Sequence, residues 1–221
     1  MIFNNRGKYR MKKEKIIEIF ELLKEEYPDA KCSLDFNTPF EMMIAVALSA
    51  QCTDERVNKV TADFFPKYNT PEDFANMPIE QIEELIHSCG FYHNKAKNIK
   101  LASQKILKDF HGEVPQTMEE LISIPGVGRK SANVIMLEAF NNPQGIAVDT
   151  HVKRLSNRIG FSKKSEPEKI EQDLLKQIPR EYWKDANHIL IWHGRKVCKS
   201  QNPQCEKCCL RNLCEHPVII K

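Results

Sequence analysis

Signals that start and stop α-helices recur along this chain of 221 residues and constrain its fold more than any other feature. An N-cap residue precedes first-turn acids, which the positive end of a helix favours, in four segments: Thr38-Pro39-Phe40-Glu41, Thr70-Pro71-Glu72-Asp73, Thr117-Met118-Glu119-Glu120 and Ser165-Glu166-Pro167-Glu168. Gly90, Gly112 and Gly160 each follow apolar residues spaced three and four apart, as glycine does where a helix ends. Strand signals are almost absent, so the sequence predicts an all-α protein.

The composition excludes several classes of protein. With 41% hydrophobic residues the chain can form the core of one or two compact domains, and 33 Lys and Arg against 30 Asp and Glu leave a net charge of only +3. The longest apolar stretch, residues 42–50, is far shorter than the roughly 20 residues that span a bilayer. Because residues 1–15 also contain no apolar signal core, we expect a soluble cytoplasmic protein with no membrane partner.

Two short segments indicate how the chain is organised. The Pro- and Asn-rich sequence FNNPQG, residues 140–145, is the one boundary candidate, and we expect it to separate two helical lobes. Residues 1–10 predict a mobile basic extension, with Met11 as a second candidate for the natural start.

Four cysteines near the C-terminus form the pattern C-x6-C-x2-C-x5-C: Cys198, Cys205, Cys208 and Cys214. Four thiolates in one short loop suit either a zinc ion or an iron–sulfur cluster. Zinc folds usually use two separated C-x2-C knuckles, whereas here one close pair is flanked by wider gaps, which favours a cluster. Cys209 could replace Cys208, although only Cys208 gives the short spacing. The other cysteines are scattered and are interpreted as core thiols: Cys32, Cys52 and Cys89.

The segment LISIPGVGRKSANVIM, residues 121–136, places Pro125-Gly126-Val127-Gly128 between two apolar helical runs. Glycine permits backbone conformations that a side chain forbids, and N–H groups at the start of the second helix can hold a phosphate of a nucleic-acid backbone. The alternative is a helix turn whose glycines serve only tight packing. The longer pattern L-x-x-I-P-G-V-G-x-x-x-A resembles the helix-hairpin-helix element of DNA-binding proteins and favours the phosphate interpretation.

Lys130 follows this turn, in the first turn of the second helix, where a cation is electrostatically disfavoured. The helix dipole and an expected partial burial both favour the free amine, which is a nucleophile. A surface lysine that contacts a phosphate is an equal alternative at this position. Asp149, in AVDTHVKRLSNRIG, lies where an N-cap belongs, so it combines a structural role with a possible chemical one.

Three features of the chain together resemble the endonuclease III family of DNA glycosylases. They are PGVGRKSANV with its lysine, VDTHVKRLSNRIG with its aspartate, and the four-cysteine tail. The segment PFEMMIAVALSAQCTDERVNK is also similar to the family's early helix pair. The match runs from about residue 12 to residue 216.

The resemblance implies two helical lobes with a DNA-binding cleft between them. One is a six-helix barrel domain, residues 32–142, with the helix-hairpin-helix at about 117–140. The other is a discontinuous iron–sulfur domain, residues 1–31 plus 143–221, in which the four-cysteine pattern holds a [4Fe–4S] cluster. The family also implies a monomer that binds double-stranded DNA containing a damaged base or an abasic site, and so a cytoplasmic enzyme associated with the nucleoid when bound.

Carried over residue by residue, the resemblance makes Lys130 the nucleophile and Asp149 its carboxylate partner. The implied enzyme is a bifunctional DNA glycosylase and AP lyase of base excision repair, with oxidised pyrimidines as the expected lesions. It releases the damaged base, forms a lysine Schiff base with the sugar and nicks the strand 3′ to the abasic site by β-elimination. Rotating the damaged nucleotide out of the stack costs a few kcal/mol.

Further positions are expected to contact DNA. The resemblance implies that the backbone phosphate is held by Gly126, Val127 and Gly128. It also implies that Gln51 fills the space left by the extruded base, with a hydrogen bond at the end of a helix as the alternative role. Phe91 stands in the wedge loop, where leucine is more usual, and its apolar ring suits insertion between bases. Two other residues border the implied pocket, with ordinary helix-turn and packing roles as their alternatives: Asp54 and His151.

Three alternatives differ from this assignment in function. A monofunctional adenine mismatch glycosylase lacks the lysine and usually carries a further C-terminal domain. An iron–sulfur redox carrier leaves the PGVG hairpin and Lys130 unexplained, and a non-catalytic DNA-binding module leaves Lys130 with Asp149 unexplained. Covalent trapping on abasic DNA separates the last of these from an enzyme.

Overall fold

The computed structural model of the protein describes residues 11–215, so the extension predicted for residues 1–10 lies outside the described residues. Within that range the chain forms eleven α-helices, three short 3-10 turns and no strand, which confirms the predicted all-α class. None of the helices in the described part is long and apolar enough to cross a membrane.

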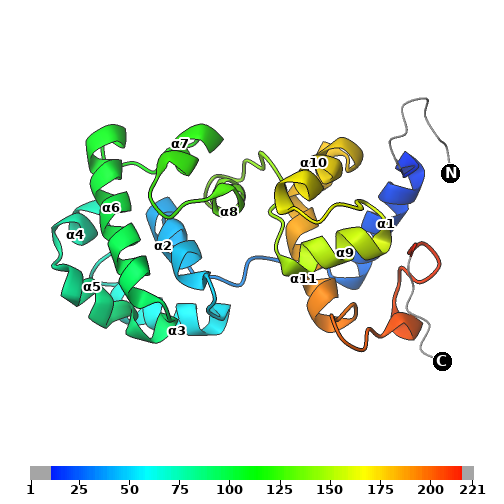
Figure 1. The fold of residues 1–221 in the computed structure, drawn as a ribbon, viewed down its shortest axis with the longest axis horizontal. Coiled ribbons are helices and arrows are strands. Elements are labelled where there is room, and N and C mark those ends of the chain that lie inside the picture. The colour runs from blue at the N-terminus through cyan, green and yellow to red at the C-terminus, as the bar shows by residue number, and fades with distance from the viewer. Residues whose placement is uncertain (1–10, 216–221) are drawn as a thin grey trace. The chain divides into compact units, whose positions relative to one another are not determined.

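The chain divides into two compact units (Figure 1). Unit 2 is one continuous segment, Cys32–Gln144, and unit 1 combines the two remaining parts, Met1–Lys31 and Gly145–Lys221. The boundary at which the chain passes from unit 2 back to unit 1, between Gln144 and Gly145, falls within the FNNPQG segment. Unit 1 therefore needs both ends of the sequence to complete its core.

Unit 2 contains seven α-helices around one hydrophobic core. They are α2 Pro39–Ser49, α3 Asp54–Phe64, α4 Pro71–Asn76, α5 Ile79–Ile86, α6 Tyr92–Phe110, α7 Met118–Ser123 and α8 Arg129–Phe140, with a 3-10 turn η1 at His87–Cys89. The long helix α6 packs against α4 and α5, and α2 packs against α8. Helix α2 is buried along most of its length because PFEMMIAVALS is apolar on nearly every face.

Unit 1 is built from helices that are distant in sequence. They are α1 Lys13–Glu26, α9 Thr150–Ile159, α10 Pro167–Gln177 and α11 Trp183–Lys196, with 3-10 turns η2 at Arg180–Tyr182 and η3 at Cys205–Lys207. Phe20 of α1 lies 5.9 Å from the ring of Phe161 and 5.2 Å from that of Tyr182, measured between centroids. Full burial of such a side chain stabilises the fold by roughly 1.5–3 kcal/mol. These contacts fix α1 against the C-terminal half of the chain.

A helix begins at each of the four predicted segments, and the predicted cap forms at three of them. The hydroxyls of Thr38, Thr70 and Thr117 each accept a hydrogen bond from the backbone N–H three residues on, at 3.1, 3.2 and 3.3 Å. At the fourth segment the predicted cap is wrong, because Glu166 occupies the N-cap position of α10 and no side chain caps that helix. Ser165 lies one residue before the N-cap position, and its hydroxyl donates to Glu166 Oε2 at 3.3 Å.

Candidate active site and DNA-contacting loops

Helices α7 and α8 form a hairpin whose turn admits no side chain at Gly126. Val127 N–H donates to the carbonyl of Ile124 at 3.0 Å, which closes the turn, and Val127 is buried in the core of unit 2. Gly126 has a φ of +82°, and a Cβ built on it would lie 2.9 Å from Asn98 Cβ of α6. Both the backbone conformation and the close approach of α6 therefore require glycine here.

Gly128 serves a different purpose in the same turn. It is the N-cap of α8, with φ −90° and ψ 174°, a conformation open to any residue, and it supplies no side-chain cap. A Cβ added there would meet no atom within 4 Å. The first intrahelical bond runs from Ala132 N–H to Gly128 O at 2.9 Å. The N–H groups of residues 129–131 thus precede the helical ladder at an end of the helix that favours anions.

Lys130 is the second residue of α8 and is exposed to solvent. The expectation of partial burial is therefore wrong. The buried residues of α8 begin two positions later, at Ala132 and Asn133, so the first turn projects from the core and its side chains point outward.

Asp149 is the N-cap of α9, as the sequence predicts. Its Oδ1 accepts a hydrogen bond from Val152 N–H at 2.8 Å, and the side chain is half-buried. His151 follows in the first turn, where burial lowers its pKa and the nearby Asp149 carboxylate acts to raise it. The neutral imidazole Nδ1 can accept from Arg154 Nη2, 3.1 Å away. The start of α9 thus holds a carboxylate, an imidazole and a guanidinium within two helical turns.

Gln51 and Phe91, the two side chains expected to enter DNA, share an unusual backbone conformation. Gln51 has a φ of 54° and Phe91 a φ of 47°, which is the left-handed region that non-glycine residues rarely adopt. Both are exposed, and the Phe91 ring leaves 65% of its area open to solvent. Such a conformation costs on the order of 1–3 kcal/mol per residue and is typical of functional loops.

The four predicted cysteine ligands line one cavity in unit 1. Its wall also contains His193 and Arg158 and includes η3, but not Cys209, so Cys208 is the member of the vicinal pair that faces the cavity. Among residues 11–215 no three His, Cys, Asp or Glu side chains gather at the position of a single metal ion. The four thiols thus line the same cavity, but they do not converge on the position of a single metal ion.

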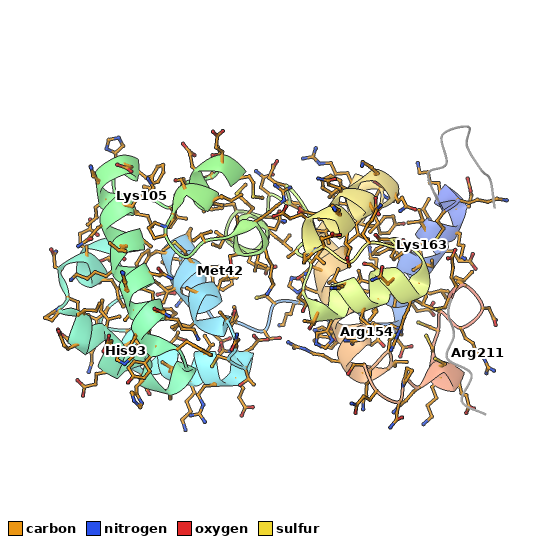
Figure 2. All side chains as sticks on the ribbon, in the orientation of Figure 1. Met42, His93, Lys105, Arg154, Lys163 and Arg211 are labelled. Atoms are coloured by element: carbon orange, nitrogen blue, oxygen red, sulfur yellow. The ribbon has the colours of Figure 1, made fainter. Side chains whose placement is uncertain are left out.

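Arginines of α9 hold the loop that carries Cys198. Arg158 donates from Nη1 to Cys198 Sγ at 3.4 Å and to the carbonyl of Lys199 at 2.7 Å. Arg154, labelled in Figure 2, donates from Nε to the carbonyl of Cys198 at 3.1 Å. These roles were not predicted, although the spacing of four residues between the two arginines places them on one face of a helix.

His193 joins the cysteine cavity to helix α1. Its Nε2 lies 3.4 Å from Cys208 Sγ, and its Nδ1 lies 2.9 Å from the hydroxyl of Tyr27. Burial lowers the pKa of His193 to about 4, which keeps the ring neutral at neutral pH. No pattern in the sequence singles out this histidine, because its partners are far away along the chain.

Comparison with known proteins identifies the family. Residues 44–180 match the model of the HhH-GPD superfamily base excision DNA repair protein. Endonuclease III of Synechocystis sp. is 51% identical over 207 residues, which cover 94% of this chain and 94% of the relative. The chain belongs to the endonuclease III family of base excision repair glycosylases.

Two solved structures of endonuclease III share the fold. Each is 45% identical to this chain, covers 94% of it and 97% of its own length, and superposes with a TM-score of 0.88. One is a non-covalent endonuclease III–DNA complex, and the other is a trapped endonuclease III–DNA covalent intermediate. The endonuclease III fold therefore extends over nearly the whole of this protein.

Proposed function

We propose that this member of the endonuclease III family acts as a bifunctional DNA glycosylase and AP lyase on double-stranded DNA that contains an oxidised pyrimidine or an abasic site. The observation that carries the proposal is a primary amine, Lys130, in the first turn of a helix that begins at an uncapped glycine. A helix start of this kind is suited to a backbone phosphate, and the amine beside it is suited to attack on the adjoining sugar.

The chemistry of Lys130 follows from that placement. Its neutral amine attacks C1′ of the extruded nucleotide as the N-glycosidic bond breaks, and the base leaves with the bonding electron pair and takes up a proton. The C1′–O4′ ring bond then breaks, O4′ takes up the proton that the amine nitrogen gives up, and C1′ is left joined to Lys130 as an imine, which acidifies the hydrogen on C2′. Removal of that proton expels the 3′ phosphate, so the strand is nicked and the amine is regenerated by hydrolysis.

Asp149 supplies the negative charge in this scheme. Its carboxylate stabilises the positive charge that develops on the sugar and assists proton movement. One of its oxygens is already used to cap α9, so the bond to Val152 N–H fixes the carboxylate in place while the second oxygen stays available. The cap therefore pre-organises the group for its chemical role.

The remaining contacts bind and open the DNA. We assign the phosphate contact to the turn of Gly126, Val127 and Gly128. Val127 N–H is bonded within the turn to the carbonyl of Ile124, so the donors to the phosphate are the first N–H groups of α8, which fix position without reading sequence. Phe91 enters the stack as a wedge, and Gln51 occupies the space of the extruded base. Their exposure supports this assignment, because it leaves both side chains accessible to DNA.

The four cysteines that line the cavity fit a [4Fe–4S] cluster, since all four thiols face one space and the vicinal Cys209 does not. When bound, such a cluster supplies a rigid anchor for the loop rather than bond chemistry. We assign it to a discontinuous domain, residues 1–31 plus 143–221, and the hairpin to a barrel domain, residues 32–142. Arg158 and His193 would donate hydrogen bonds to the cluster thiolates, as they face Cys198 and Cys208 here.

Borohydride trapping on a duplex with one abasic site tests the function. The reagent reduces the imine to a stable amine, so the wild-type protein is expected to form a covalent adduct with the DNA. Lys130→Arg keeps the positive charge but removes the primary amine, and it should form no adduct while it still binds the duplex. An adduct with Lys130→Arg, or none with the wild type, would exclude the proposed nucleophile.

A further inference from the structure

Lys95 is a buried lysine that has no role in the proposed reaction. It lies near the start of α6, leaves only 7% of its surface exposed and packs within unit 2. Among residues 11–215 no carboxylate is paired with it, and burial lowers its pKa while the thiols of Cys89 and Cys52 act to raise it. A buried ammonium group is costly unless its protons are bonded, so its hydrogen-bond partners indicate its purpose.

Both partners of Lys95 are backbone carbonyls at the ends of short elements. Its Nζ donates to the carbonyl of Leu48 at 2.8 Å and to that of Cys89 at 2.6 Å. Leu48 is in the last turn of α2, where carbonyls lack helical partners and a cation is favourable. Cys89 is the last residue of η1. One ammonium group thus joins the C-terminal ends of two elements.

Each of these ends leads directly into one of the strained, exposed residues. Gln51 follows Leu48 by three positions, and Phe91 follows Cys89 by two. The thiol of Cys52 lies near that of Cys89, where burial and then Cys52 raise the pKa of Cys89, so the same two loops meet a second time. Figure 2 labels His93 near the N-terminal end of α6, which is the end that carries Lys95, and Lys105 nearer its C-terminal end.

We propose that Lys95 is a positioning residue that holds the Gln51 and Phe91 loops in one fixed arrangement, so that both side chains enter the duplex together. The inference rests on the proposed function, because it assigns to Lys95 the geometry of the two inserting residues. It involves no contact between Lys95 and DNA. Loss of the ammonium group removes the two hydrogen bonds that join the loops to Lys95. The proposed nucleophile, Lys130 on α8, is not changed.

The experiment compares two substrates that differ in whether a base stack must be opened. One is a duplex with a single abasic site, and the other is the same abasic strand without its complement. For Lys95→Met, the rate of borohydride trapping on the duplex should fall on the order of 10- to 100-fold, as expected for misplacement of remote positioning groups. Trapping on the single strand should change little, because no stack has to be held apart.

Lys100→Met is the matched control. Lys100 lies on the same helix, and its Nζ also donates to a backbone carbonyl, that of Met77, which leads into neither inserting loop. This variant should leave the ratio of duplex to single-strand trapping unchanged. Lys95→Arg, which keeps the charge and the donors, should restore more of the duplex rate than Lys95→Met does. If Lys95→Met does not fold, Lys95→Gln retains a shorter donor and should lower the ratio by a smaller factor.

A second readout follows the opening of the stack without chemistry. With 2-aminopurine opposite the abasic site, the wild type should raise the fluorescence of the probe on binding, and Lys95→Met should raise it less. An unchanged substrate ratio in Lys95→Met, an equal loss on both substrates, or the same shift in Lys100→Met overturns the proposal. Failure of the wild type to trap either substrate rejects the proposed function instead, so the two failures are distinguishable.

Discussion

Helices α8 and α9 begin in opposite ways, although each carries one proposed catalytic residue at its N-terminus. Helix α8 starts at Gly128, which supplies no cap, and its second residue is the exposed Lys130. Helix α9 starts at Asp149, which caps it, and its second residue is the half-buried His151. The start of α8 thus has no side-chain cap, whereas the start of α9 uses a first-turn N–H group to fix a carboxylate.

The largest expected effect comes from removing the charge of the α9 cap. Asp149→Asn keeps the cap, because asparagine caps helices as well as aspartate, but it lowers the rate of base release on the order of 100-fold or more. Single-turnover assays of base release measure the rate, and urea denaturation should show an unchanged free energy of unfolding. Asp149→Ala loses the cap as well and should be about 1 kcal/mol less stable. A wild-type rate in Asp149→Asn would remove the carboxylate from the chemistry.

The two glycines of the α8 turn should respond differently to alanine. Gly126→Ala forces a side chain into a φ of +82° and against Asn98, so it should destabilise the protein by at least about 1–2 kcal/mol. Gly128→Ala meets open space and should change the free energy of unfolding far less. Urea denaturation of both variants checks the contrast, and equal losses would contradict the structure of the turn.

A side-chain cap added to α8 should increase the stability of the fold and lower the affinity for DNA. Gly128→Ser supplies a hydroxyl for a first-turn N–H and should stabilise the fold by a few tenths of a kcal/mol. The affinity for abasic duplex should fall about tenfold, because a hydrogen bond to a charged group contributes about 1.5–3 kcal/mol. Fluorescence anisotropy at fixed salt measures the affinity. A gain in both quantities would show that this helix start does not hold a phosphate.

The smallest expected effect concerns pH and the second residue of α9. Burial lowers the pKa of His151 in the folded state, with Asp149 opposing and Arg154 and Arg195 assisting that shift. The unfolded chain therefore binds the proton first, and stability present above pH 6.5 is lost as the pH falls toward the folded pKa. His151→Gln should lose less stability than the wild type between pH 7.5 and pH 5.5 in urea denaturation. An identical loss would show that the imidazole stays accessible to protons.

Local features of the fold and site were predictable from the sequence, and long-range ones were not. The cap at Asp149 and the PGVG turn depend on neighbours within a few residues, so the pattern of residues suffices to find them. The exposure of Lys130 depends on which face of α8 meets the core, and the predicted partial burial of this residue was wrong. Lys95 was missed because its two carbonyl partners carry no signal in the side-chain sequence.

The composition of unit 1 has a consequence for the order of folding. Unit 2 is continuous and can fold as soon as its segment has been made, whereas α1 has no partner until α9, α10 and α11 follow more than 120 residues later. During synthesis the apolar side chains of α1 around Phe20 therefore stay exposed until these helices have been made, and exposed apolar surface of this kind is what chaperones bind. A chain interrupted after residue 144 would contain the hairpin and Lys130 but lack Asp149 and the cysteine cavity, so under the proposed mechanism only complete chains would cleave DNA.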